Sequence, residues 1–432
     1  MKNFLTQRIR FLRALSVQPF ALLWTGQTIS SLGDGAFTLA LAWEVLLLTG
    51  SATAIGLTVT AEILPRLIFL LLGGVAADRL PRRLIMLCSD SGRGLVVLLI
   101  AVLAWLHLLQ LWHLIILSLL FGIAAGFFNP AYRSIPPQLV DVEMLPSANA
   151  LTSMTQQMSA LLGPLLGAGL VALVGPVGAF AFDGLTFLAS ACCLLAMHLP
   201  SAKALISSGY ADETSLVLTK PSLSHRLQRV VEDLHEGWRF AVSAKWFWIG
   251  LPIATLGNIF FSGPLEVTLP KLVHDVYGTG AWLFGSIGAS MAIGSIIATF
   301  IVGQVSSMPR RGTIAYLAVA LASLSEGILG LPLPQAVAPV IACIAGGLVG
   351  LGLGTFGIIW VTLMQELVPQ DKLGRVSSID QLSAWALLPV GYALTGVVTD
   401  QLGPSLVFLI ASIANVVLAI IALTVPDIRK LE

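Results

Sequence analysis

Charged side chains are scarce in this sequence. Only 10% of the 432 residues are Asp, Glu, Lys or Arg, while 56% are hydrophobic; soluble proteins carry about 25% charged residues. So few charges cannot cover the surface of so apolar a soluble core, which excludes an ordinary globular enzyme and a disordered chain. The formal net charge of +1 provides no basic face for a nucleic acid. The mean hydropathy of +0.91 therefore indicates a helical protein that crosses a lipid bilayer several times.

Motifs for metal, nucleotide or covalent chemistry are missing as well. The four cysteines, Cys88, Cys192, Cys193 and Cys343, lie in apolar runs without metal-ligand spacing, so we expect buried apolar side chains and no metal site. No Gly-x4-Gly-Lys-Ser/Thr loop is present, which excludes a nucleotide-driven pump. We expect no cofactor and no enzymatic activity. A membrane-bound sensor or enzyme is the non-transport alternative, and no residue cluster or sizeable soluble domain supports it.

Apolar runs bounded by Gly, Pro and charge predict twelve membrane spans, each close to the ~20 residues that a crossing needs, or longer. Their limits are 20–47, 52–76, 84–107, 112–137, 147–172, 176–199, 246–272, 281–305, 313–332, 336–367, 375–399 and 404–426. Of the 23 basic residues, 19 fall in the N-terminal segment and in alternate connections, and only Lys271 falls in the opposite connections. Because basic residues stay on the cytoplasmic side, we expect both termini there.

An internal repeat relates the two halves of the chain. At an offset of 228 residues, the Pro-Arg-Arg at 81–83 aligns with that at 309–311, and Gly35 and Gly163 align with Gly263 and Gly391. We therefore predict an all-α membrane protein with two pseudo-symmetric six-helix halves, 1–199 and 246–432, and a cytoplasmic linker, 200–245. The linker should end in an amphipathic helix over 225–245, either as a plain connection or as a lipid-binding, regulatory element.

A basic motif follows the second span. Gly74-Val-Ala-Ala-Asp78-Arg79-Leu-Pro-Arg82-Arg83 resembles the signature of the major facilitator superfamily, Gly-x-x-x-Asp-Arg-x-x-Arg-Arg. The glycine would permit close helix approach, and the arginines would face anionic lipid headgroups. The resemblance implies that Asp78 belongs to a cytoplasmic gate between spans two and eleven. The alternative is a motif that only sets the topology.

Further segments resemble one branch of that superfamily, the macrolide-efflux and enterobactin exporters among the drug:proton antiporters. Span five contains Gly163, Pro164 and Gly167 in the order of the antiporter motif Gly-Pro-x-x-Gly, for which tight helix packing is the other interpretation. In span four, Ser118 stands where the superfamily places an arginine. The other matching segments are 30–34, 89–93, 129–133 and 366–376.

This resemblance implies the major facilitator fold and a function in transport. We expect a monomeric, multi-pass protein of the bacterial cytoplasmic membrane that exports amphipathic, lipophilic small molecules by proton antiport with alternating access. Substrate, protons and the lipid bilayer would be its partners. A dedicated exporter or flippase for a siderophore or a lysolipid is the alternative, although a siderophore cavity should carry more cationic side chains than the spans provide.

Ionisable residues at mid-membrane depth are costly and therefore point to function. At ~1.5 Å per residue, Asp34 lies roughly 21 Å from the cytoplasmic start of span one, and Arg66 roughly 18 Å from the cytoplasmic end of span two. Glu62 lies one helical turn from Arg66 on the same face. These three residues should form one cluster, in which one carboxylate pairs with the arginine. The other, Asp34 or Glu62, would take up the transported proton.

Other polar and aromatic residues within the spans have weaker assignments. Glu44 and Glu266 lie toward the outer ends of their spans, where water would satisfy them, and Asp90 should pair locally with Arg93. Glu326 receives no role. Residues that would line a substrate cavity by hydrogen bonding or stacking are Trp43, Gln157, Asn258, Trp360, Gln365 and Trp385.

Overall fold

The computed structural model describes residues 10–197, 239, 242–305, 308–429 and 431, and the regular elements among these residues are all helical. A first group of helices comprises η1 (Arg10–Ser16), α2 (Gln18–Thr49), α3 (Ala52–Arg79), α4 (Arg82–Trp105), α5 (Leu111–Ser134), η2 (Pro136–Gln138), η3 (Val142–Met144) and α6 (Leu145–Ala196). The second group comprises α9 (Lys245–Gly263), η5 (Pro264–Thr268), α10 (Leu269–Lys271), η6 (Leu272–Val276), α11 (Ala281–Gln304), α12 (Arg311–Leu329), α13 (Ala338–Leu367), α14 (Gln370–Ala386), α15 (Leu388–Leu402), α16 (Pro404–Thr424) and α17 (Pro426–Arg429).

Local sequence explains where many of these helices begin and end. Ser51 precedes α3 and accepts a hydrogen bond from the Ala54 amide, which satisfies one of the free donors of the first turn. Gly50 ends α2 with a left-handed φ of 65°, a conformation that glycine adopts without strain. Prolines occupy the first turn of α6, α13, α15 and α16, where the missing N–H costs nothing.

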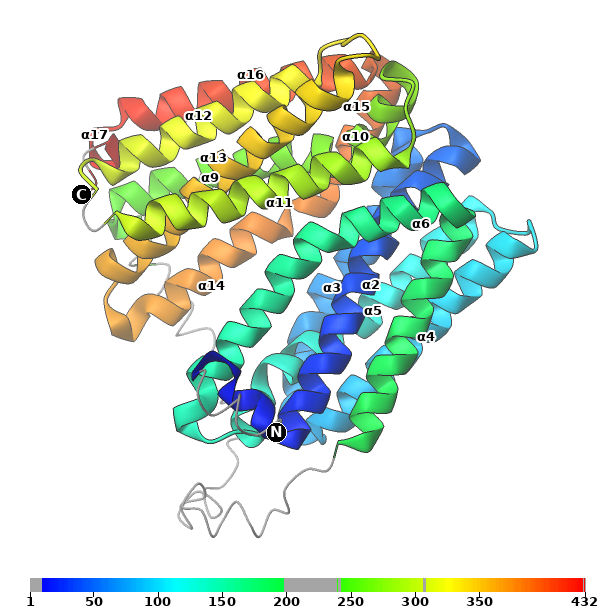
Figure 1. The fold of residues 1–432 in the computed structure, drawn as a ribbon. Coiled ribbons are helices and arrows are strands. Elements are labelled where there is room, and N and C mark those ends of the chain that lie inside the picture. The colour runs from blue at the N-terminus through cyan, green and yellow to red at the C-terminus, as the bar shows by residue number, and fades with distance from the viewer. Residues whose placement is uncertain (1–9, 198–238, 240–241, 306–307, 430, 432) are drawn as a thin grey trace.

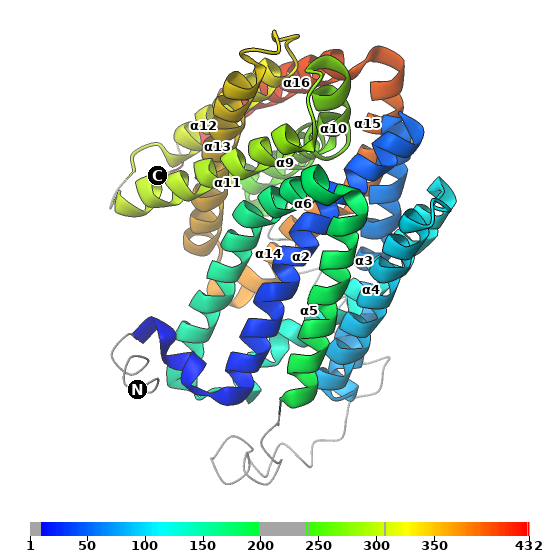
Figure 2. The ribbon, with the colours of Figure 1, turned by 45° about the vertical axis from the view of Figure 1, so that its right-hand side comes forward.

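Within the described residues, eleven helical segments are long and apolar enough to cross a membrane. Ten of them correspond to single predicted spans, whereas α6 covers the predicted pair 147–172 and 176–199. Its 52 residues would extend about 78 Å, far more than the ~30 Å hydrocarbon layer. Gly175, with φ 75° and ψ 175°, breaks the helix, and the chain reverses there (Figures 1 and 2). The number of twelve crossings and the side of the termini stay predictions.

The sequence repeat has a counterpart in the structure. Helix α3 begins at Ala52 and α11 at Ala281, 229 residues later, close to the predicted offset. The aligned glycines contact equivalent neighbours: Gly35 and Gly163 pack α2 against α6, and Gly263 and Gly391 pack α9 against α15. Both groups therefore use the same helix pairs in the same way. The proposed boundaries at 199 and 245 enclose residues that lie mostly outside the described ones, as does the predicted amphipathic helix.

The two groups meet at one end of the molecule and diverge toward the other (Figure 1). We call the end that carries Arg79, Arg82, Arg310 and Arg311 the basic end, and the other the opposite end. Near the opposite end, α3 contacts α15 and α6 contacts α11. A Cβ at Gly396 of α15 would lie 2.6 Å from the carbonyl oxygen of Ala52, so the backbones of α3 and α15 touch there.

Candidate functional site

A central cavity of about 770 Å³ lies between the two helix groups. Residues of α2 and α6 line one side, and residues of α9, η5, α11, α12, α13, α14 and α16 line the other. Most of these side chains are aliphatic or aromatic, and none of the lining residues is Lys, Arg or His. The cavity is large and apolar enough for a drug-sized molecule.

Two of the six predicted cavity residues line this space, Asn258 and Trp360. Asn258 donates a hydrogen bond to the Ala384 carbonyl (2.7 Å), and the Trp360 indole donates one to Asp380 Oδ1 (3.0 Å). The remaining four are not among the lining residues of the central cavity or of the second pocket described below. Trp43 is buried in the core against His274, while Gln157, Gln365 and Trp385 are exposed.

A second pocket of about 420 Å³ lies within the first group, and Asp34, Glu62 and Arg66 all line it, as their predicted clustering requires. Thr38 lines both cavities, so the two spaces adjoin there. Close packing of α3 against α5 holds Glu62 in place, because Gly122 lies directly against the Glu62 carbonyl oxygen. A larger residue at position 122 would push Glu62 and Arg66 out of the pocket.

The expected ion pair of Arg66 is absent among the described residues. Arg93 takes its place: its guanidinium lies 3.8 Å from Asp34 Oδ2 and 2.5 Å from Asp90 Oδ1. The predicted local pair of Asp90 and Arg93 is thus present, but it is part of the mid-membrane cluster. The faces of Phe128 and Phe187 lie 4.5 Å from the guanidinium carbon of Arg93, and such contacts stabilise a buried cation.

Asp90 and Asp183 are the members of this cluster that sequence reasoning missed. Asp90 is fully buried and accepts hydrogen bonds from Gln27 (3.2 Å) and Ser190 (2.7 Å). Asp183 of α6 is also fully buried beside Gly33, and its Oδ2 has no hydrogen-bond partner among the described residues. Both residues are visible in the sequence as acids inside predicted spans, although nothing in the sequence places them beside Asp34.

The basic motif acts partly as a set of helix caps. Arg82 donates to the Ser134 carbonyl at the end of α5, and Arg83 donates to the Leu194 and Leu195 carbonyls near the end of α6, at 2.6 and 2.7 Å. Asp78 and Arg79 are exposed and make no hydrogen bond or ion pair with a described residue. The predicted packing role of Gly74 is wrong, because a Cβ added there would meet no atom within 4 Å. At the neighbouring Gly73, an added Cβ would lie 2.6 Å from the Gly126 carbonyl oxygen, so Gly73 is the glycine that packs closely.

The Gly163–Gly167 segment of α6 contacts both groups. A Cβ at Gly163 would lie 2.8 Å from the Gly35 Cα, and one at Gly167 would lie 2.9 Å from the Ala36 Cα. On another face, the Pro164 carbonyl oxygen lies 2.6 Å from the missing Cβ of Gly285 in α11. The segment therefore packs α6 tightly on α2 and also forms part of the junction with the second group.

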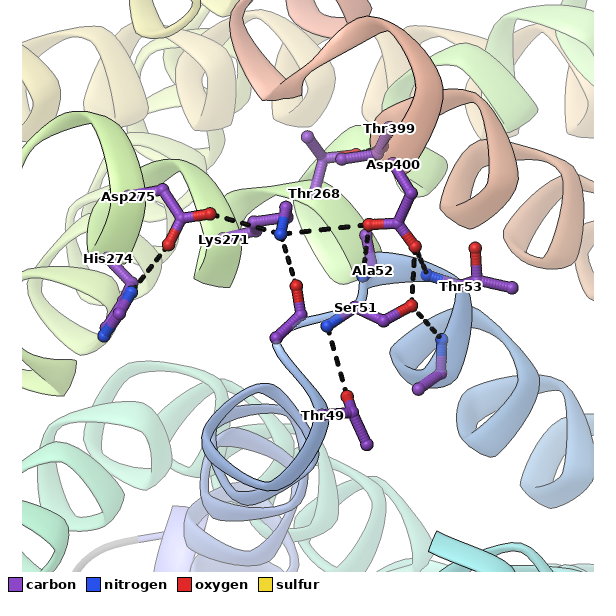
Figure 3. A network of polar contacts seen from close by, with 12 residues as sticks. Thr49, Ser51, Ala52, Thr53, Thr268, Lys271, His274, Asp275, Thr399 and Asp400 are labelled. Atoms are coloured by element: carbon purple, nitrogen blue, oxygen red, sulfur yellow. Dashed lines mark hydrogen bonds and ion pairs between the residues drawn. The ribbon is translucent and has the colours of Figure 1, made fainter.

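At the opposite end, a polar network connects the groups (Figure 3). Asp400 of α15 accepts hydrogen bonds from the Ser51 hydroxyl (2.5 Å) and from the amides of Ala52 and Thr53 (both 2.9 Å), at the start of α3. Lys271 donates to the Gly50 carbonyl and lies 3.8 Å from Asp400. We call Ser51, Lys271 and Asp400 the latch. An aspartate at a helix N-terminus is favoured by the free amides and the helix dipole.

In the described part of the chain, two helix groups surround a central cavity and contact each other near one end, an arrangement typical of membrane transporters. The model of the Major Facilitator Superfamily matches residues 23–390, and the chain belongs to this superfamily. Macrolide efflux protein A of Streptococcus pyogenes is 23% identical over 417 residues, covering 96% of this chain and 97% of that protein. Multidrug efflux pump Tap of Mycolicibacterium fortuitum is 27% identical over 425 residues, covering 96% and 97%.

Solved structures show the same fold. A D-xylose–proton symporter superimposes with a TM-score of 0.67 at 14% identity, covering 95% of this chain and 99% of that one. A bacterial homologue of the iron transporter ferroportin in its inward-facing state gives a TM-score of 0.65 at 15% identity, covering 93% and 98%. These likenesses confirm the predicted fold class.

Proposed function

We propose that this protein exports amphipathic, lipophilic small molecules from a bacterial cell by alternating access. The observation that carries the proposal is the apolar cavity of about 770 Å³ between two helix groups that are joined at one end. The relatives named as macrolide and multidrug efflux proteins support the direction of transport and the class of substrate. With the basic end on the cytoplasmic side of the membrane, the structure corresponds to a state closed toward the outside by the latch.

Proton antiport is the proposed source of energy, and the charge balance of the second pocket supports it. Four carboxylates, those of Asp34, Glu62, Asp90 and Asp183, lie in or beside the pocket, and three arginines, Arg66, Arg93 and Arg133, line it. Asp90 pairs with Arg93 and accepts hydrogen bonds from Gln27 and Ser190. Asp34 lies 3.8 Å from Arg93, and its Oδ1 has no hydrogen-bond partner among the described residues. A carboxylate without a close cation favours its protonated form in a low-dielectric setting. Asp34 and Glu62 therefore carry the transported proton.

The test is drug-driven proton release from proteoliposomes with the wild type, Asp34→Asn, Glu62→Gln and the control Asp427→Asn. Asp427 is an exposed residue of α17 at the basic end. We expect the double variant Asp34→Asn/Glu62→Gln to lose coupling and the control to retain it. If the double variant releases protons as the wild type does, the assignment of the proton site is refuted; if the wild type moves no drug, the export function is refuted.

The cavity also bears on the alternative of a siderophore exporter. An anionic siderophore requires cationic side chains, and the described lining of the central cavity contains none. The composition of the cavity therefore favours the export of lipophilic compounds. We propose that the transporter acts as a monomer, because both its cavities are complete within one chain.

A further inference from the structure

Glu266 is a carboxylate of the central cavity that the proposed proton pathway does not use. Two acidic residues line the cavity, Glu266 and Asp380. Asp380 accepts a hydrogen bond from the Trp360 indole at 3.0 Å. Glu266 makes no hydrogen bond or ion pair with a described residue, and its side chain is exposed in the cavity while the neighbouring Val267 and Thr268 are buried. It is therefore an acid of the central cavity that has no partner among the described residues.

Glu266 lies toward the opposite end, as the sequence predicts, but its side chain lines the central cavity. It lies in η5, a π-helical segment inside the continuous helical run Lys245–Val276, where the backbone widens. It is five residues, about 7.5 Å of helix, from Lys271 of the latch. Single π-helical turns often coincide with functional sites, because they aim a side chain away from the regular helix surface.

The surroundings of Glu266 suit a hydrophobic body. Phe261, Leu265 and Phe284 line the cavity together with it. On the cavity wall formed by α13, Phe356 and Trp360 stack with ring centroids 5.7 Å apart and an interplanar angle of 18°. Flat aromatic faces bind both hydrocarbon rings and cations. With no Lys, Arg or His among the lining residues, an anionic ligand would meet only repulsion and a neutral ligand would leave the carboxylate unpaired.

We propose that Glu266 is a specificity-determining residue that selects amphipathic ligands carrying one cationic nitrogen, either a protonated amine or a quaternary ammonium group. This inference rests on the proposed export function. The cationic nitrogen of the ligand pairs with the carboxylate, and its apolar body contacts the aromatic wall. An ion pair in this cavity is stronger than one in bulk water, because the apolar lining lowers the local dielectric constant and the charge of the ligand compensates the desolvation of the carboxylate.

Glu266 and the proton-binding acids have separable roles. Glu62 and Asp34 line the second pocket, which adjoins the central cavity at Thr38, whereas Glu266 lines the central cavity only. Loss of the Glu266 charge should therefore weaken the binding of cationic ligands but not of neutral ones. Loss of Asp34 and Glu62 should instead uncouple proton release from the transport of every ligand. If Glu266 had only a structural role, its replacement would weaken the binding of all ligands equally.

The test measures equilibrium binding of ethidium, a permanent cation, and of Nile red, a neutral dye, to purified protein in lipid nanodiscs. The variants are Glu266→Gln, Glu266→Asp and the control Glu143→Gln, which replaces an exposed glutamate of η3. We expect Glu266→Gln to lower the affinity for ethidium at least tenfold and to change the affinity for Nile red by less than twofold. Glu266→Asp should restore part of the ethidium affinity, and the control should bind both dyes as the wild type does.

Each other result overturns the proposal. Unchanged ethidium affinity in Glu266→Gln would refute the role of the carboxylate. An equal loss of affinity for both dyes would assign Glu266 a structural role instead. Failure of the wild type to bind either dye would refute the export function together with this inference. Binding of both dyes by the wild type, without discrimination by Glu266→Gln, would refute the inference alone.

Discussion

Replacing Asp400 with alanine should open the opposite end of the transporter. The carboxylate belongs to α15 of the second group, and its three hydrogen-bond donors belong to Ser51, Ala52 and Thr53 of the first. These bonds form only while the two groups are in contact at this end. In the separated state, water replaces the carboxylate at the α3 amides. The energy of the contact therefore stabilises one conformation of the transport cycle relative to the other.

The magnitude follows from the geometry. Hydrogen bonds to a charged group contribute about 1.5–3 kcal/mol each when buried, but the Asp400 side chain is 27% exposed and screening by water lowers this value. Lys271, at 3.8 Å, adds a weak attraction. We take about 2–3 kcal/mol for the loss of the whole side chain, which changes the ratio of the two conformations by roughly 30- to 150-fold.

Distances between spin labels at Leu108 and Leu331 would measure this shift, in a variant whose four native cysteines are replaced. Leu108 lies between α4 and α5 and Leu331 between α12 and α13, both exposed at the opposite end. We expect one short distance in the wild type and an additional longer distance in Asp400→Ala. Asp427→Asn serves as the control, because it removes an acid at the basic end. An unchanged distance distribution in folded Asp400→Ala would refute the latch.

The remaining predictions concern stability and use matched pairs of variants. Gly163→Ala should destabilise the solubilised protein by about 1–3 kcal/mol, because its Cβ would lie 2.8 Å from Gly35, whereas Gly169→Ala meets open space and should not; equal melting temperatures would contradict the packing role. Arg83→Ala should lower the free energy of unfolding by about 1–3 kcal/mol, because it removes the guanidinium donor from the Leu194 and Leu195 carbonyls, of which the Leu194 carbonyl keeps the Met197 amide as a donor. The same change at the exposed Arg79 should be close to neutral, and thermal unfolding of the two variants compares them directly.

The fold was largely predictable from local features of the chain. Apolar run length predicted most helix limits to within a few residues, since it depends on the segment itself, and the 228-residue repeat predicted two related helix groups. The side of the termini, predicted from the asymmetry of basic residues, stays a prediction. The break between the two arms of α6 followed from Gly175 and Pro176. The repeat matches Gly35 with Gly263 and Gly163 with Gly391, but it does not show that Gly35 and Gly163 contact each other.

The candidate site was only partly predictable. Placing Asp34 and Glu62 at similar depths predicted that they share a pocket, and the structure places both there. The prediction that Arg66 pairs with one of these carboxylates relied on adjacent spans, whereas the structure brings Arg93 from α4 to Asp34. Depth along a helix follows from residue number, but the direction in which a side chain faces does not. Lipid and helix interfaces are both apolar, so the hydrophobic pattern barely distinguishes the faces of a spanning helix.

The scarcity of charge in the sequence thus determined that this protein crosses a membrane. The positions of the few charged residues along the chain determined which end of the helices carries the arginines and which acids lie inside the predicted spans. Only the tertiary structure decided which of those acids meet. Asp400 caps a helix that begins 349 residues earlier, and Glu266 faces a cavity whose other wall belongs to α2 and α6. Such contacts depend on the rotation and lateral packing of whole helices, and these are set by glycine contacts and helix breaks distributed over the entire chain.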